Sequence, residues 1–164
     1  MWIKALKAFL AGLLFLYIQI LAMSALTIGN IVPLILLPWL IATVWKHPQE
    51  ISLPVVFLIG LMYDTQLPET FGMHALLFCL LAVLINTLRI PFEQDSVVAK
   101  LIAIGSSNLV FALLSMLGFG ISWGFDSKLY WLSLAAFFYN LIFSLLVFAI
   151  MQLISHLRLV VVNE

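Results

Sequence analysis

The sequence predicts an all-α integral membrane protein, a compact bundle of six transmembrane helices with both termini in the cytoplasm. Three observations predict this fold class. The 164 residues are 65% hydrophobic and 9% charged, whereas soluble domains carry about 25% charged residues. The apolar residues gather in six long runs, and the basic residues gather on one side of those runs. A chain of this kind acts within or beside a bilayer, which excludes most classes of soluble enzyme.

The six apolar runs cover residues 5–23, 28–45, 52–67, 72–88, 97–121 and 129–154. Each approaches or exceeds the roughly 17 to 25 residues that cross a hydrocarbon core about 30 Å thick. We interpret the runs as helices, because lipid cannot satisfy an open backbone and the runs lack the alternation of barrel strands. The third run is marginal, since it carries Asp64 near its end. No linker or repeat divides the chain, so residues 1–164 are expected to form one domain.

The first run is preceded by Lys4 and Lys7 and followed by small residues near Ala22, as in a secretory signal. Its apolar part is longer than the about 7 to 15 residues of a signal core, so we expect an uncleaved first helix.

Prolines shape the next two runs. Pro33 and Pro38 lie in the second run and predict a bent helix, because each lacks an amide donor. In the third run, Pro54 follows Ser52 by two residues. Serine is a good helix cap and proline is tolerated in a first turn, so the third helix is expected to start there.

The orientation follows from the basic residues. Only Lys128 lies on the side away from the termini, and the other six of the seven lie on the terminal side: Lys4, Lys7, Lys46, Arg89, Lys100 and Arg158. Cytoplasmic loops carry an excess of Lys and Arg, so this distribution predicts cytoplasmic termini. The net charge of zero gives no reason to expect a nucleic-acid partner.

A few polar residues interrupt the apolar runs. Asn108 and Asn140 lie near the middle of the fifth and sixth runs, and Gln19 lies in the first. We interpret their amides as cross-links between helices, with Gly105 allowing close approach and with help from Ser106, Ser107 and Ser144. The alternative is a polar ligand pocket or a partner helix. No ionisable residue lies at mid-depth, which argues against a proton relay or an ion-coupled pump.

The third run, the turn after it and the fourth run hold the main candidate site. The turn returns the chain to the same surface, so Asp64 and His74 are expected to form a hydrogen-bonded pair. Catalysis would also need a nucleophile or a metal, and no serine elbow or H-E-x-x-H spacing is present. We therefore expect no catalytic, cofactor or metal site. The favoured interpretation is a structural pair that pins the turn, with Gly60 and Gly72 allowing close helix packing.

The same segment resembles the family of the bacterial rod shape-determining protein MreD. The residues that carry the resemblance are Pro33 in the second run and then Gly60-Leu61, Asp64, Gly72 and His74-Ala75-Leu76. Chain length, number of spans and cytoplasmic termini agree with the family. One departure is the turn at residues 66–71, which holds less glycine and serine than the family's usual form.

The resemblance implies a non-enzymatic scaffold in the inner membrane that helps maintain rod shape and organise lateral peptidoglycan synthesis. It implies work with an MreC-like protein and with a peptidoglycan polymerase and transpeptidase, and an indirect link to an actin-like filament protein. It also implies a bundle similar to the substrate-binding subunits of energy-coupling-factor transporters. Two other functions stay open: a transporter subunit that binds a vitamin-like molecule, and an intramembrane enzyme that uses Asp64 or His74.

Overall fold

The computed structural model describes residues 2–29, 31–66, 68–90 and 96–162, with side chains up to residue 153. Six α-helices dominate the described residues: α1 (Trp2–Leu21), α2 (Leu36–Lys46), α3 (Gln49–Asp64), α4 (Met73–Arg89), α5 (Val97–Trp123) and α6 (Ser127–Val162). Two short 3-10 helices, η1 (Met23–Leu26) and η2 (Pro68–Thr70), lie in the connections. In this part of the chain an isolated bridge between Ile28 and Ile31 is the sole β pairing, so the prediction of an all-α fold is confirmed.

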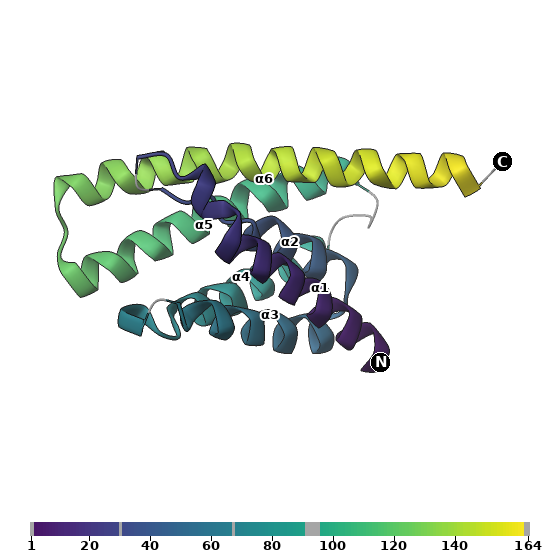
Figure 1. Ribbon diagram of the computed structural model, residues 1–164, viewed down its shortest axis with the longest axis horizontal. Helices are drawn as coiled ribbons and strands as arrows, with labels where there is room; N and C mark the ends of the chain where they lie inside the picture. The colour runs from purple at the N-terminus through teal and green to yellow at the C-terminus, as the bar shows by residue number, and fades with distance from the viewer. Residues whose placement is uncertain (1, 30, 67, 91–95, 163–164) are drawn as a thin grey trace.

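Helices α3 and α6 run along the long axis of the molecule, and α1 crosses that axis obliquely (Figure 1). Figure 1 shows α1 beginning and α6 ending at the same end of the molecule, beside the turn between α2 and α3. The η2 turn and the turn between α5 and α6 lie at the opposite end. By length and composition α1, α5 and the part of α6 up to Leu153 are long and apolar enough to cross a membrane. The apolar helices α2 and α4 are shorter, so the prediction of six crossings stays a prediction.

The predicted second helix, residues 28–45, is wrong in its first half. Helix α2 begins only at Leu36, and the preceding residues are not helical. Pro33 disfavours a helical conformation for the residue before it, and Gly29 takes a left-handed conformation with φ of 57°. Pro38 falls in the first turn of α2, where its missing amide costs little. Pro33 therefore lies before the helix and Pro38 in its first turn, and neither lies in the helix interior, where the predicted bend would arise.

The start of the third helix also differs from the prediction. Helix α3 begins at Gln49, after Pro48 in an extended conformation, and Pro54 lies inside the helix. Ser52 is fully buried in α3, and its hydroxyl has no partner within the described residues, so it is not a cap. The predicted end at residue 67 lies outside the described residues, and α3 itself ends at Asp64.

The core is built around α2, α3 and α4. Nine of the eleven α2 residues are buried, and α3 and α4 lie so close that a Cβ on Gly60 would approach the Ala75 Cα to 2.7 Å. Helices α1, α5 and α6 instead expose many large apolar side chains, among them Leu10, Leu14, Leu113, Phe138, Ile142 and Leu146. Exposed apolar faces of this extent are what a lipid environment or a partner helix requires.

Candidate functional site

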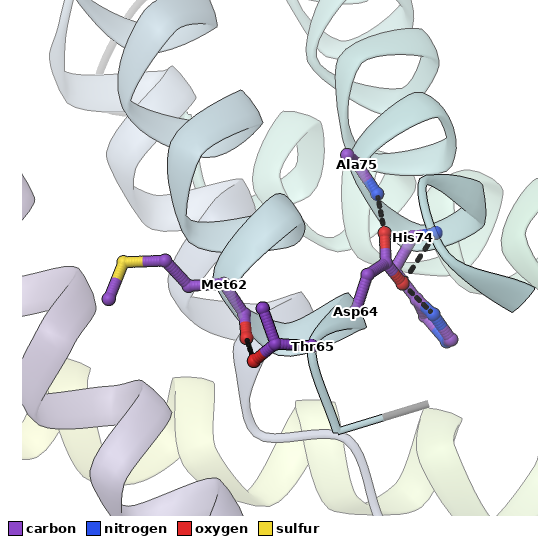
Figure 2. Close-up of polar contacts among 5 residues, drawn as sticks. All are labelled: Met62, Asp64, Thr65, His74 and Ala75. Atoms are coloured by element: carbon purple, nitrogen blue, oxygen red, sulfur yellow. Dashed lines mark hydrogen bonds and ion pairs between the residues drawn. The ribbon is translucent and has the colours of Figure 1, made fainter. Parts of the chain in front are cut away.

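Asp64, the last residue of α3, caps the first turn of α4. Its Oδ1 accepts hydrogen bonds from the His74 backbone N–H at 3.1 Å and from His74 Nδ1 at 2.8 Å. Its Oδ2 accepts from the Ala75 N–H at 3.0 Å. Figure 2 shows these three bonds converging on the one carboxylate. Because the N–H groups of a first helical turn have no partner within the helix, Asp64 supplies the cap from a neighbouring helix.

Two glycines make this cap possible for different reasons. Gly60 lies one helical turn before Asp64, and its missing side chain lets α3 approach the Ala75 backbone. Gly72 precedes α4 with a φ of 88°, a conformation that L side chains rarely adopt. No atom lies within 4 Å of the position that a Cβ on Gly72 would take. The expected close-packing role is therefore wrong for Gly72, which allows the sharp entry into α4 instead.

His74 is held among aromatic rings. The Tyr63 ring meets it edge to face with centroids 4.9 Å apart, and Phe78 and Phe111 each lie at 6.3 Å. A carboxylate only accepts hydrogen bonds, so the Nδ1 of His74 donates to Asp64 and its Nε2 is left as an acceptor. The predicted Asp64–His74 pair is thus present. In the described residues no three His, Cys, Asp or Glu side chains gather as a metal site.

Gln19 and Asn140 serve the non-helical segment before α2. Gln19 Nε2 donates to the Pro33 carbonyl at 3.1 Å, and its Oε1 accepts from the Ile35 N–H at 2.8 Å. Asn140 Oδ1 accepts from the Leu34 N–H at 2.9 Å. These amides do connect distant elements, but their partners are backbone groups that a continuous helix would have satisfied internally. The sequence signal that points to this role is the pair of prolines in an apolar run.

Asn108 does not cross-link helices as predicted. Its Nδ2 donates to the Ile104 carbonyl of its own helix at 2.9 Å, and its Oδ1 has no partner among the described residues. The buried hydroxyls of Ser107 and Ser144 likewise have none there. No atom lies within 4 Å of a Cβ placed on Gly105, so that glycine does not provide close approach.

A small cavity of about 170 Å³ joins several of these residues. His74, Asn108 and Asn140 all line it, together with Tyr63 and Ser115. The positions of the two asparagines near the middle of their apolar runs do not predict that they share one cavity with His74. Asp64, at 0% exposure, lies behind His74 and does not line it. This cavity offers hydrogen-bonding groups and one imidazole nitrogen, but no charged side chain.

Arg89, at the opposite end of the bundle, has a structural role beyond its predicted place among the cytoplasmic charges. Its guanidinium donates to the carbonyls of Val44 at 3.0 Å, Trp45 at 2.9 Å and His47 at 3.4 Å. These bonds satisfy the carbonyl end of α2. Burial and the nearby charges of Lys46 and Lys4 lower the pKa of His47, so positive charges gather at this end. The side chain of Arg158 lies outside the described residues.

Residues 3–155 match the model of a family described as the rod shape-determining protein MreD. The matched range runs from α1 into α6 and contains Gly60, Asp64, Gly72, His74, Asn108 and Asn140. No curated protein and no solved structure matches the chain.

Proposed function

Because the chain belongs to the family of the rod shape-determining protein MreD, we propose that it is a non-enzymatic scaffold of the bacterial cell-elongation machinery. Membership gives it a role in rod shape determination. The finer proposal is that it organises lateral peptidoglycan synthesis by holding other membrane proteins together. Its proposed partners are membrane lipid, an MreC-like protein and a peptidoglycan polymerase and transpeptidase, with an indirect link to an actin-like filament protein.

One observation carries the scaffold proposal. The carboxylate of Asp64 is fully buried and is occupied by three hydrogen bonds that hold α3 to α4. A carboxylate used in this way fixes the geometry of two helices and is not available to a substrate. What the described residues offer to other membrane proteins is the exposed apolar surface of α1, α5 and α6. Such surfaces associate with other membrane helices through packing.

We place the chain in the inner membrane as six crossings with cytoplasmic termini, in a bundle similar to the substrate-binding subunits of energy-coupling-factor transporters. The hydrogen bonds of Gln19 and Asn140 support the membrane placement. Non-helical backbone at membrane depth is tolerated only where protein groups satisfy it, and these two amides do so for the segment before α2. The basic residues gathered near Arg89 and His47 support the orientation.

A transporter subunit that binds a vitamin-like molecule is the second candidate. The cavity lined by His74, Asn108 and Asn140 favours it, because the Asn108 Oδ1 there lacks a partner among the described residues. The volume of this cavity argues against the transporter function. The cavity measures about 170 Å³, below the roughly 300 to 1,000 Å³ of small-molecule sites. Tight stoichiometric binding of a vitamin-like solute by the purified protein would establish this second function.

The scaffold proposal is tested with His74→Ala in cells that lack their own copy of the chain. Cell shape is scored by microscopy, and partners are identified by mass spectrometry after copurification from native membranes. If the chain is a scaffold, cells with the variant should lose their rod shape, and the MreC-like protein and the polymerase should be missing from the purified complex. An enzyme predicts round cells with partner capture intact, and that result would refute the proposal.

A further inference from the structure

A second cavity lies away from the Asp64–His74 site, at the basic end of the bundle. It measures about 450 Å³ and is formed by α2, α5 and α6. Apolar side chains make much of its wall, including Ala42, Ile104, Phe148 and Met151. Lys46 and Lys100 also line it. Lys46 is the last residue of α2, and Lys100 lies in the first turn of α5, so both belong to one end of the cavity.

Neither lysine is in ion-pair contact with a carboxylate within the described parts of the chain. The sole ion-pair contact there is the distant Asp64–His74 pair. The Lys46 side chain is exposed, and that of Lys100 is half-buried. Arg89 holds the carbonyls of Val44 and Trp45 and so fixes the end of α2 that carries Lys46. The end of α2 that carries Lys46 is therefore held in place by the fold.

The apolar wall and the two lysines together favour a lipid as the occupant of this cavity. Water is disfavoured along the apolar wall, because a buried water needs two to four polar partners. A lipid tail suits that wall, and the volume of about 450 Å³ falls within the roughly 300 to 1,000 Å³ of known ligand sites. Basic pockets between membrane helices on the cytoplasmic side bind anionic head groups. The apolar wall and the two ammonium groups together match the two halves of one phospholipid.

We propose that this cavity binds an anionic phospholipid, with the phosphate between Lys46 and Lys100 and an acyl chain along the apolar wall. The site is distinct from the cavity at His74 and does not depend on which proteins the scaffold holds. It rests on the proposed orientation only for the leaflet, which would be the inner one. The lipid would lie between α2 on one side and α5 and α6 on the other, at the end of the bundle that faces the cytoplasm.

The first test removes the charges. The purified full-length protein is titrated with phosphatidylglycerol or phosphatidylcholine of identical acyl chains, and bound lipid is counted by native mass spectrometry. We expect the anionic lipid to bind more tightly. Lys46→Gln with Lys100→Gln should weaken its binding about 25-fold, since each lysine contributes about five-fold. The binding of phosphatidylcholine should change much less.

The matched control is Lys4→Gln with Lys7→Gln, which removes the same charge at the same end but from exposed α1 residues outside the cavity. It should leave the affinity for phosphatidylglycerol unchanged. Equal affinity of the wild-type protein for the two lipids would overturn the proposal. So would an equal loss of binding in the two double variants, because that result would mean a general attraction to positive charge.

The second test fills the cavity and keeps both lysines. Ala42→Phe places a ring in the space meant for the acyl chain, and circular dichroism with size-exclusion chromatography checks that the variant is folded. We expect it to lose both lipids. Inorganic phosphate serves as the head-group probe without a tail and should not displace the bound lipid at an equal concentration. Phosphate binding as tight as that of phosphatidylglycerol would refute the lipid assignment and leave an anion site.

Discussion

The cap that Asp64 provides makes a quantitative prediction about stability. Asp64→Ala leaves the N–H groups of His74 and Ala75 without their acceptor in a buried environment, and it frees the His74 ring. Each buried donor left without a partner costs about 1 to 3 kcal/mol, and a lost helix cap costs about 0.5 to 2 kcal/mol. Because the three bonds share one carboxylate, we expect a total loss of about 3 to 5 kcal/mol.

The Asp64→Asn variant removes the negative charge of the side chain and keeps its shape. The amide keeps one acceptor oxygen but turns an NH₂ group toward a backbone donor, so about half of the capping energy should remain, roughly 2 kcal/mol. Thr65→Ala is the matched control from the same turn, since it removes a single exposed bond of 2.7 Å to the Met62 carbonyl (Figure 2). An exposed substitution of this kind should cost about 0.5 kcal/mol or less.

The assay is reversible unfolding of the purified protein in mixed micelles with increasing sodium dodecyl sulfate, followed by circular dichroism. The expected order of stability is wild type and Thr65→Ala, then Asp64→Asn, then Asp64→Ala. If Asp64→Ala unfolds at the same detergent fraction as Thr65→Ala, the carboxylate does not hold the two helices together. The argument that Asp64 and His74 form a structural pair would then be wrong.

The same unfolding assay tests three further predictions. Gly60→Leu should cost about 1 to 3 kcal/mol or more and weaken partner copurification, because its Cβ would meet the Ala75 backbone; Gly105→Leu, with open space, is the control. Gln19→Leu should lower the free energy of unfolding more than Asn140→Leu does, because Gln19 bonds two backbone groups and Asn140 bonds one. The reverse order would contradict the role of these amides in the segment before α2. Asn108→Leu should change stability by about 1 kcal/mol or less, since its single bond is to its own helix; loss of cell shape with the protein still folded would instead indicate a ligand in the cavity.

The predicted fold class, the order of the helices and the Asp64–His74 pair all came from local patterns. Long apolar runs predict helices because lipid leaves the backbone no other partner. Asp64 and His74 lie only ten positions apart on either side of one turn, so the chain itself brings them together. Family membership was indicated by the same short segment. These features need no knowledge of how distant helices pack.

Helix boundaries near proline were predicted less well. The apolar run at residues 28–45 was continuous in hydropathy, yet α2 takes only its second half. Hydropathy measures the preference for lipid, whereas the helix start depends on whether other groups can satisfy the free backbone. Those groups are Gln19 and Asn140, which lie 16 residues before Ile35 and 106 residues after Leu34. No local pattern relates such positions.

The sequence by itself determined that this chain is helical, apolar enough for a membrane and a member of the MreD family, because composition and short motifs decide each of these. Tertiary structure alone decided which side chains share a cavity. His74, Asn108 and Asn140 meet at one cavity, and Lys46 and Lys100 meet at another. The physical reason is that a cavity forms where helices far apart in sequence fail to pack, and that depends on the shapes of all the surfaces at once.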